Sequence, residues 1–325
     1  MNNNLLEVNN LKTHFLLEEG VLKAVDGVSF SLKKGETLAI VGESGSGKSV
    51  TSLSIMRLIT PPGKITSGSI IFNGDDLLKY SQDEIRKIRG DRISLIFQDP
   101  FTSLNPVLTI GDQLTEGLII HKNMDKNKAM EEVLKILKKV HIPDPEKRVK
   151  SYPHELSGGM RQRVMIAMAL ICNPEIIIAD EPTTALDVTI QAQILELMRE
   201  LKDELDSSII LITHNLGIVA GFCDRVLVMY AGSILEEAPV NDIFNDPFHP
   251  YTKALLKCLP KLDTENKGEL PSIKGQPPDL AAAASGCRFA PRCGKVMDIC
   301  REKIPDLFDK GKNRKVRCWL YDNKQ

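Results

Sequence analysis

Apolar residues follow two kinds of pattern along this chain. Short, almost continuous aliphatic runs occur at residues 37–41, 176–179, 209–212 and 226–229. Such runs are typical of strands that are buried on both faces of a sheet. Residues 188–205 instead repeat their apolar positions at helical spacing. Because predicted strands alternate with predicted helices, we expect an α/β fold with a largely parallel core sheet.

The segments around this core have different patterns. Residues 5–41 hold short alternating runs broken by glycines, which predicts a small antiparallel β region. Residues 68–74 and 93–97 predict a second, hairpin-like pair of strands. From about residue 101 to residue 172 the spacing is mainly helical, so this stretch is expected to be a helical insert.

The composition changes at about residue 231, where prolines begin to accumulate. The sequence therefore predicts two domains. Residues 1–230 would form the α/β core domain with its insert, and residues 231–325 a small, loop-rich appendage.

Residues 42–49 read Gly-Glu-Ser-Gly-Ser-Gly-Lys-Ser, a full match to the pattern GxxxxGK[ST]. They follow a predicted strand and precede a helical pattern. The glycines allow successive backbone N–H groups to converge on phosphate oxygens, and the helix N-terminus adds the positive end of its dipole. Lys48 is expected to reach the β- and γ-phosphates of a nucleotide, and Ser49 to hold Mg²⁺. The predicted nucleotide-binding residues of this segment are Gly42, Ser44, Gly45, Ser46, Gly47, Lys48, Ser49 and Val50.

The apolar run at residues 176–179 ends in two carboxylates, Asp180 and Glu181. Alone, this pair would be two solvated acids at the end of a strand. In a chain with a phosphate loop, the first acid is expected to hold Mg²⁺, directly or through water, and the second to activate a water molecule. We therefore predict nucleotide hydrolysis with Glu181 as the general base.

A second anion site is predicted where Ser157, Gly158 and Gly159 open a helix. Free N–H groups and a hydroxyl at a helix N-terminus can bind phosphate. Without other motifs, Ser157 would be an ordinary helix N-cap.

These motifs, together with Gln98, Asp187 and His214, occur in the order and approximate spacing of the ATP-binding subunits of ABC transporters. The chain resembles that family over nearly its whole length. The resemblance implies a P-loop NTPase cassette with a mainly parallel core sheet, an antiparallel β subdomain and a helical subdomain. It also implies that ATP is sandwiched between two subunits, with the helix at Ser157 of one facing the phosphate loop of the other.

The same resemblance assigns roles to residues that would be unremarkable alone. Gln98 would contact Mg²⁺ and the attacking water, and His214 the γ-phosphate. Asp187 would help to couple the two sites. Phe15 would stack on adenine, although it could equally be a core residue.

The start of the appendage resembles a segment typical of the oligopeptide, dipeptide and nickel uptake branch of the family, from Asp246 to Leu256. The resemblance implies an ATPase that energises peptide import. Its expected partners are a second ATPase subunit, expected to be a paralogue, two transmembrane permease subunits and, indirectly, an extracellular peptide-binding protein. Nickel import remains an alternative. A soluble ABC ATPase acting on nucleic acid or ribosomes is less expected, because neither a second cassette nor a long coiled-coil insertion is visible.

Charge and hydropathy limit the location and partners. The chain has 42 Lys and Arg residues against 43 Asp and Glu residues, a formal net charge of -1, so nucleic acid is not an expected partner. No apolar stretch approaches the roughly 18 residues that a membrane-spanning helix requires. The first residues of the chain lack the basic and then apolar profile of a secretory signal peptide. We expect a peripheral protein at the cytoplasmic face of the membrane.

Four of the seven cysteines gather near the end of the chain. In a reducing compartment such thiols do not indicate disulfides, but four thiolates can hold Zn²⁺ or an iron–sulfur cluster. The spacing lacks the C-x₂-C pairs of ordinary zinc sites, and the neighbouring Lys and Arg residues favour an anionic cluster. Proteins of the dipeptide branch that the chain resembles carry a four-iron cluster on such cysteines; zinc and unmetallated thiols remain open. The candidate ligands are Cys287, Cys293, Cys300 and Cys318.

Overall fold

The computed structural model describes residues 4–99, 103–184, 187–259, 272–281 and 285–322.

The described chain forms two compact units. Unit 1 comprises Leu32–Glu36 and Lys79–Leu211. Unit 2 comprises Asn4–Ser31, Thr37–Leu78 and the chain from Ile212 onward. The segment predicted as a separate appendage therefore shares a unit with the phosphate loop.

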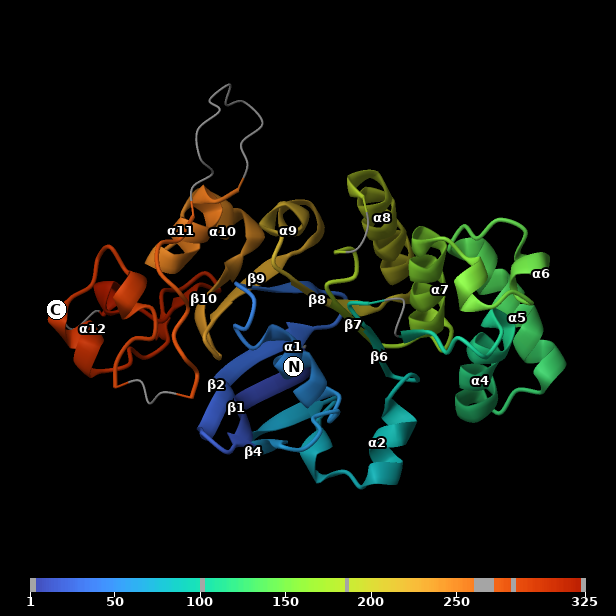
Figure 1. Cartoon of the computed structure of the whole chain (residues 1–325), viewed down its shortest axis with the longest axis horizontal. Helices are drawn as coiled ribbons and strands as arrows, with labels where there is room; N and C mark the ends of the chain where they lie inside the picture. Colours follow the sequence, from blue (N-terminus) through green and yellow to red (C-terminus); the bar gives the residue numbers. More distant parts are fainter. Residues whose placement is uncertain (1–3, 100–102, 185–186, 260–271, 282–284, 323–325) are drawn as a thin grey trace. The chain divides into compact units, whose positions relative to one another are not determined.

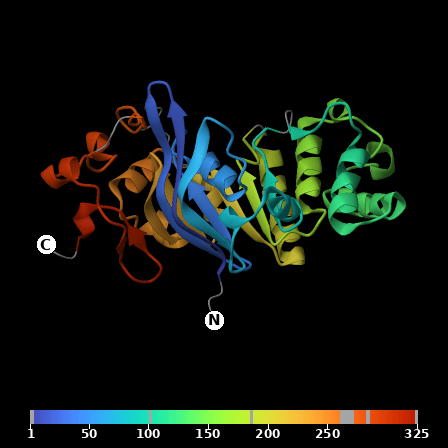
Figure 2. The ribbon, with the colours of Figure 1, turned by 90° about the horizontal axis from the view of Figure 1, so that it is seen from below.

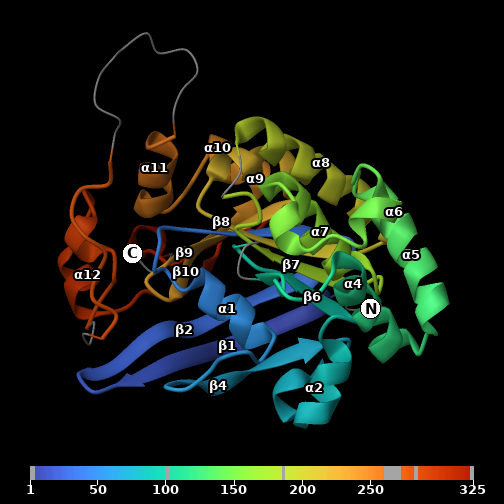
Figure 3. The same cartoon turned by 45° about the vertical axis from the view of Figure 1, so that its right-hand side comes forward.

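Unit 2 begins with an antiparallel sheet in the strand order β2-β1-β4-β5. Figure 2 shows its long strands side by side, in blue. Helix α1 follows the phosphate loop and packs on this sheet, where Thr13 and Ser54 share a buried hydrogen bond of 2.8 Å (Figure 3). The predicted antiparallel region is thus present. Its elements are β1 (Asn4–Leu17), β2 (Gly20–Lys33), α1 (Lys48–Ile55), β4 (Gly63–Phe72), β5 (Asp75–Asp76) and the 3₁₀ turn η1 (Leu77–Lys79).

The second sheet region of unit 2 is centred on β9. β9 pairs in parallel with β3 and antiparallel with β10, and β12 and β11 continue beyond β10. All residues of β3 and β9 are buried, as their continuous apolar runs predict. The strands are β3 (Thr37–Val41), β9 (Arg225–Tyr230), β10 (Ser233–Pro239), β11 (Phe308–Asp309) and β12 (Lys315–Val316).

The chain after residue 231 is more ordered than the predicted loop-rich appendage. A turn at Ala231 and Gly232 returns the chain at once into β10, so the sheet continues past the expected boundary. Prolines then mark helix starts, at Pro250 for example, rather than loops alone. The remaining elements of unit 2 are α9 (Leu216–Phe222), α10 (Val240–Asn245), α11 (Pro250–Lys257), η3 (Ala290–Arg292), α12 (Asp298–Glu302) and η4 (Trp319–Tyr321).

Unit 1 combines strands with most of the helices (Figure 1). The hairpin predicted from residues 68–74 and 93–97 is wrong. β4 pairs with β1 in unit 2, whereas β6 pairs in parallel with β7 in unit 1. The intervening helix α2 has a capping box between Ser81 and Glu84, which favours a helix here and separates the two strands. The strands of unit 1 are β6 (Ile93–Ile96), β7 (Ile176–Asp180) and β8 (Ser208–Thr213), and the chain passes into unit 2 within β8.

The predicted helical insert is present in unit 1. α4, α5, α6 and α7 gather in the green part of Figure 1. Asp125 caps α5, and Val133 and Leu137 on its apolar face are buried, as the spacing predicts. α7 is buried over most of its circumference and forms the centre of this group. The helices are α2 (Gln82–Ile88), α4 (Ile110–Lys122), α5 (Lys126–Lys139), α6 (Pro145–Arg148), η2 (Pro153–Glu155), α7 (Gly158–Leu170) and α8 (Val188–Leu205).

No helix among the described residues combines the length and the apolar character needed to cross a membrane.

Candidate nucleotide-binding site

The phosphate loop in unit 2 encloses the side chain of Lys48. This side chain is 5% exposed, and its Nζ donates to the carbonyl oxygens of Gly42 and Glu43 at 2.9 and 3.0 Å. Nζ also lies 3.5 Å from the Ser46 hydroxyl oxygen. The loop thus holds an ammonium group at its centre, where it can meet phosphate oxygens.

Glycine is required at the end of the loop. Gly47 is the N-cap of α1 and has φ of 101°, a backbone conformation that L side chains rarely adopt. A Cβ there would lie 2.3 Å from the carbonyl oxygen of Ala24. Both the loop conformation and its close contact with β2 therefore exclude a side chain.

The outer part of the loop fits a bound phosphate. Ser44, Gly45 and Ser49 are exposed, and a Cβ on Gly45 would meet nothing within 4 Å. Open space thus lies over a loop whose lysine is already oriented by carbonyl oxygens. Ser49 lies in the first turn of α1, where its hydroxyl oxygen can coordinate Mg²⁺.

Phe15 lies in β1 opposite Gly63 and is partly exposed. The space above Gly63 is filled by the Phe15 ring, whose Cε1 would be 2.6 Å from a Cβ at that position. Its role toward adenine stays a prediction.

The two predicted carboxylates belong to unit 1, where β7 places them. Asp180 ends β7 and is 8% exposed, and Glu181 follows with φ of 46°. The left-handed backbone turns the chain sharply at the strand end. Such a conformation costs about 1–2 kcal/mol for a residue with a Cβ.

Glu181 is oriented by two side chains. Gln98 Nε2 donates to Glu181 Oε2 at 3.1 Å, and the Thr184 hydroxyl donates to the same oxygen at 2.9 Å. The structure therefore brings together Gln98 and Glu181, which lie 83 positions apart. The sequence analysis missed Thr184, since a threonine three residues after an acid carries no signal of its own.

The predicted second anion site lies at the N-terminus of α7. Ser157 is the N-cap and accepts from the Met160 N–H at 3.4 Å. A Cβ on Gly159 would lie 3.3 Å from Ile190 in α8, so the starts of α7 and α8 lie close together. Asp187 caps α8 by accepting from the Ile190 N–H at 2.9 Å. Ala185 and Leu186, which precede Asp187, lie outside the described residues.

His214 directly follows β8 and is exposed in unit 2. The predicted residues therefore fall in both units. Unit 2 carries the phosphate loop, Phe15 and His214. Unit 1 carries Gln98, the two carboxylates, the start of α7 and Asp187.

Comparisons with known proteins support the same interpretation. Residues 25–184 match the family model described as "ABC transporter". The Bacillus subtilis oligopeptide transport ATP-binding protein AppD is 55% identical over 319 residues, covering 98% of this chain and 97% of that protein. The chain belongs to the ABC transporter family. The predicted family is confirmed, and with it an ATPase that uses ATP and Mg²⁺.

Other relatives and solved structures agree. The Bacillus subtilis dipeptide transport ATP-binding protein DppD is 56% identical over 321 residues, covering 98% of this chain and 96% of that protein. The Salmonella typhimurium oligopeptide transport ATP-binding protein OppD is 52% identical over 313 residues, covering 96% of this chain and 93% of that protein. A solved dimeric ATP-binding cassette bound to ADP and Pi matches with a TM-score of 0.66 and 30% identity, covering 72% of this chain and 98% of that one. The predicted cassette fold is confirmed.

The C-terminal region has its own match. Residues 235–300 match the family model described as "Oligopeptide/dipeptide transporter, C-terminal region". This match includes most of β10 and three of the four clustered cysteines.

The four clustered cysteines lie in the C-terminal region, where burial affects the pKa of three of their thiols. Burial raises the pKa of Cys287 and Cys293, and raises that of Cys318 to about 11; the negative charges of neighbouring thiolates add to each effect. However, within the described ranges no three His, Cys, Asp or Glu side chains are grouped to hold a metal ion. A metal centre thus has no support from the arrangement of these side chains.

The cationic neighbours of the cysteines also have other partners. Arg288 pairs with Asp26 at 2.6 Å, and Arg292 pairs with Glu43 at 2.6 Å. The predicted attraction between these arginines and an anionic cluster is weakened, because two carboxylates already neutralise them.

The loop geometry predicts the effect of a methyl group at Gly47. Gly47→Ala should weaken binding of a fluorescent ATP analogue at least about tenfold, because the Cβ clashes with the Ala24 carbonyl. Gly74→Ala is the matched control: Gly74 also has positive φ, 92°, but open space around its Cβ. Both changes cost backbone strain, and only Gly47→Ala should alter affinity. Equal affinities for the two variants would contradict the assigned loop geometry.

Proposed function

We propose that this chain hydrolyses ATP to energise the import of oligopeptides or dipeptides through separate membrane proteins. The supporting observation is the likeness over nearly the whole chain, including the C-terminal region, to peptide transport ATP-binding proteins. No observation favours nickel as the cargo or a soluble role on nucleic acid.

In the proposed reaction, a water oxygen attacks the γ-phosphorus of ATP and the bond to the β-phosphate oxygen breaks, giving ADP and phosphate. Glu181 orients this water and takes its proton. Gln98 and Thr184 support this role, because their hydrogen bonds to Oε2 fix the orientation of the Glu181 carboxylate. Ser49, Gln98 and Asp180 would hold Mg²⁺, which neutralises charge on the phosphates.

We infer that a second cassette completes each ATP-binding site. The exposed Ser157 and the free N–H groups at the start of α7 form an anion-binding helix N-terminus. In the dimer this end would bind the γ-phosphate held by the partner's loop. Asp187 caps the adjacent helix α8, so it is placed to couple the two sites, and His214 would contact the γ-phosphate from the end of β8.

The proposed assembly consists of this chain, a second and paralogous ATPase subunit, and two permease subunits, with an extracellular peptide-binding protein delivering cargo. The chain would bind to the permeases at the cytoplasmic face of the membrane. The absence of a spanning helix in the described residues is compatible with this peripheral position.

The test uses the whole proposed assembly in vesicles: this chain, the second ATPase subunit and both permeases, with the peptide-binding protein supplied outside. Glu181→Gln should keep ATP affinity within a few-fold and reduce hydrolysis by about 10²–10⁴-fold, because the amide cannot accept the proton. ATP-driven accumulation of a labelled peptide should fall with it. Glu196→Gln, which neutralises an exposed acid on α8, is the control and should change neither rate.

Unchanged hydrolysis in Glu181→Gln would contradict the assigned base. Normal hydrolysis by the unaltered chain without peptide accumulation, but with nickel accumulation, would contradict the cargo alone.

The four-cysteine metal centre stays a prediction with a separate test. Anaerobic purification followed by metal analysis and a visible absorption spectrum distinguishes the cases. An iron–sulfur cluster would give about four iron atoms per chain and broad visible absorption. One zinc per chain would indicate a zinc site. Metal-free protein with four free thiols at these positions would contradict a metal centre.

A further inference from the structure

Glu43 occupies a variable position of the phosphate loop pattern, yet the side chains of three other residues bond to it. Its carbonyl oxygen accepts from Lys48 Nζ at 3.0 Å. Its N–H donates to the Tyr251 hydroxyl oxygen at 3.0 Å. Its carboxylate accepts two hydrogen bonds from Arg292, at 2.6 and 3.0 Å. Two of the three partners come from the C-terminal region, about 200 positions or more along the chain.

Each nitrogen of the Arg292 guanidinium donates at least one hydrogen bond at this position. Its side chain is 4% exposed, and the bond to Glu43 is the main cause that raises its pKa. Nη1 also donates to the Tyr230 hydroxyl oxygen at 3.2 Å. Nε and Nη2 donate to the carbonyl oxygens of Lys274 and Ile273, at 3.1 and 3.2 Å. Bidentate arginine–carboxylate pairs of this kind fix direction as well as distance.

The second contact, from Tyr251, rests on a packed aromatic cluster. Tyr251 is 0% exposed, and its ring centroid lies 4.6 Å from that of Tyr230 and 5.3 Å from that of Phe289. Tyr230 and Phe289 pack edge to face at 5.4 Å. Because the rings hold one another, the Tyr251 hydroxyl cannot move away from Glu43 without disturbing the cluster.

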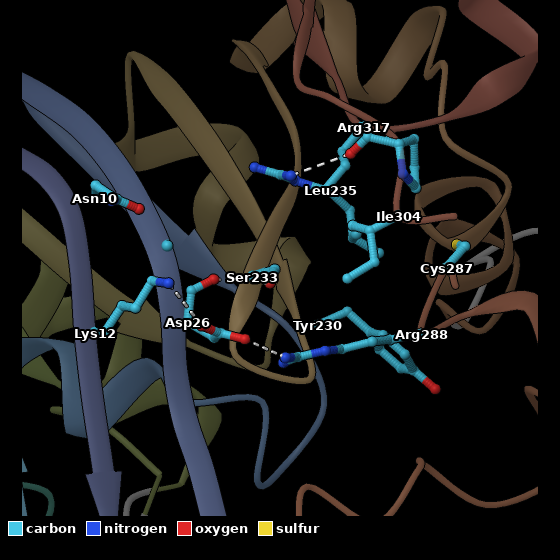
Figure 4. Close-up of a pocket in the computed structure, with 12 residues that line it drawn as sticks. Asn10, Lys12, Asp26, Tyr230, Ser233, Leu235, Cys287, Arg288, Ile304 and Arg317 are labelled. Atoms are coloured by element: carbon cyan, nitrogen blue, oxygen red, sulfur yellow. Dashed lines mark hydrogen bonds and ion pairs between the residues drawn. The ribbon is translucent and has the colours of Figure 1, made fainter. Parts of the chain in front are cut away.

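A parallel connection reaches the other side of the loop. The Gly232 N–H donates to the Ser46 carbonyl oxygen at 2.9 Å. Arg288 hydrogen-bonds to the preceding carbonyl, that of Ala231, and pairs with Asp26 on β2. Figure 4 shows Arg288 extending to Asp26 along a cavity of about 280 Å³. The turn behind the loop is thus also held by the C-terminal region.

We propose that Arg292 and Tyr251 are positioning residues for ATP binding: they hold Glu43 so that the phosphate loop keeps the conformation that presents Lys48 to phosphate. The nucleotide site of this chain therefore depends on its C-terminal region as well as on its cassette.

Charge gives Arg292 a second effect. Glu43 lies in a loop that must receive a polyphosphate, and its side chain is 24% exposed. With Arg292 present, the carboxylate is neutralised by a bidentate pair. Without Arg292, an unpaired negative charge remains in the loop and opposes phosphate binding.

The experiment measures binding of a fluorescent ATP analogue, and KM and kcat for hydrolysis, on the full chain. Arg292→Gln should weaken ATP binding at least about tenfold and raise KM more than it lowers kcat, because the loop binds the phosphates in the ground state as well. Glu43→Gln should weaken binding by no more than about threefold. The double variant should bind ATP more tightly than Arg292→Gln, since no unpaired carboxylate remains, but less tightly than Glu43→Gln, since the bond that positions residue 43 is lost.

Arg317→Gln is the matched control. Arg317 is also a partly buried arginine of the C-terminal region, and its side chain donates to the carbonyl oxygens of Ile234 and Pro305 at 3.1 Å. It should lower the thermal midpoint of unfolding without changing ATP affinity.

If Arg292→Gln does not fold, Tyr251→Phe tests the same proposal. It removes the acceptor for the Glu43 N–H and keeps the aromatic ring, so ATP binding should weaken by several-fold in a folded protein. The proposal is overturned by folded Arg292→Gln or Tyr251→Phe variants with unaltered ATP affinity. It is also overturned if the double variant binds ATP as tightly as Glu43→Gln, because Arg292 would then act only by neutralising the carboxylate.

Discussion

The enclosure of the Lys48 ammonium by the carbonyl oxygens of its own loop is the interaction on which the site depends. A buried charge needs polar partners, and here Gly42 and Glu43 supply them. The loop backbone also adopts, at Gly47, a conformation and a close contact that only glycine permits. Open space lies over the loop at Gly45, where phosphate oxygens can bind. The stability of the loop and its capacity for ATP therefore depend on the same short segment.

The chain distributes its nucleotide chemistry over two compact units. The phosphate loop belongs to unit 2, and the proposed general base with its orienting residues belongs to unit 1. In unit 2, the loop is further tied to the C-terminal region through Glu43, so the part of the chain that distinguishes the peptide branch also supports the loop.

The sequence predicted best what is local. The fully buried strands β3, β7, β8 and β9 were visible as aliphatic runs, and the phosphate loop as a contiguous motif. Helix caps such as Ser157 also follow from neighbouring residues. The partner of β6 was predicted wrongly, because a short apolar run does not reveal whether its neighbour is the previous strand or one that follows 80 residues later.

Contacts between distant residues could not be predicted in this way. Arg292 was interpreted as part of the surroundings of the cysteines, yet its carboxylate partner lies 249 positions away in the phosphate loop. No periodicity or spacing connects the two residues. The same holds for the hydroxyl of Tyr251, whose segment indicated only a branch of the family. The Arg292–Glu43 pair depends on the return of the chain through β10, which pairs with β9. The composition of the C-terminal region did not predict this strand.

Hydrogen–deuterium exchange of the full chain with and without ATP tests most directly whether the loop and the C-terminal region act together. The backbone N–H groups of Arg292 and Cys293 are bonded within η3, so their exchange reports opening of this turn. If the turn holds the loop, ATP should slow exchange at these amides together with those of residues 42–49, and Arg292→Gln should abolish the effect in η3. Slowed exchange in the loop with unchanged exchange at Arg292 and Cys293 would contradict the account.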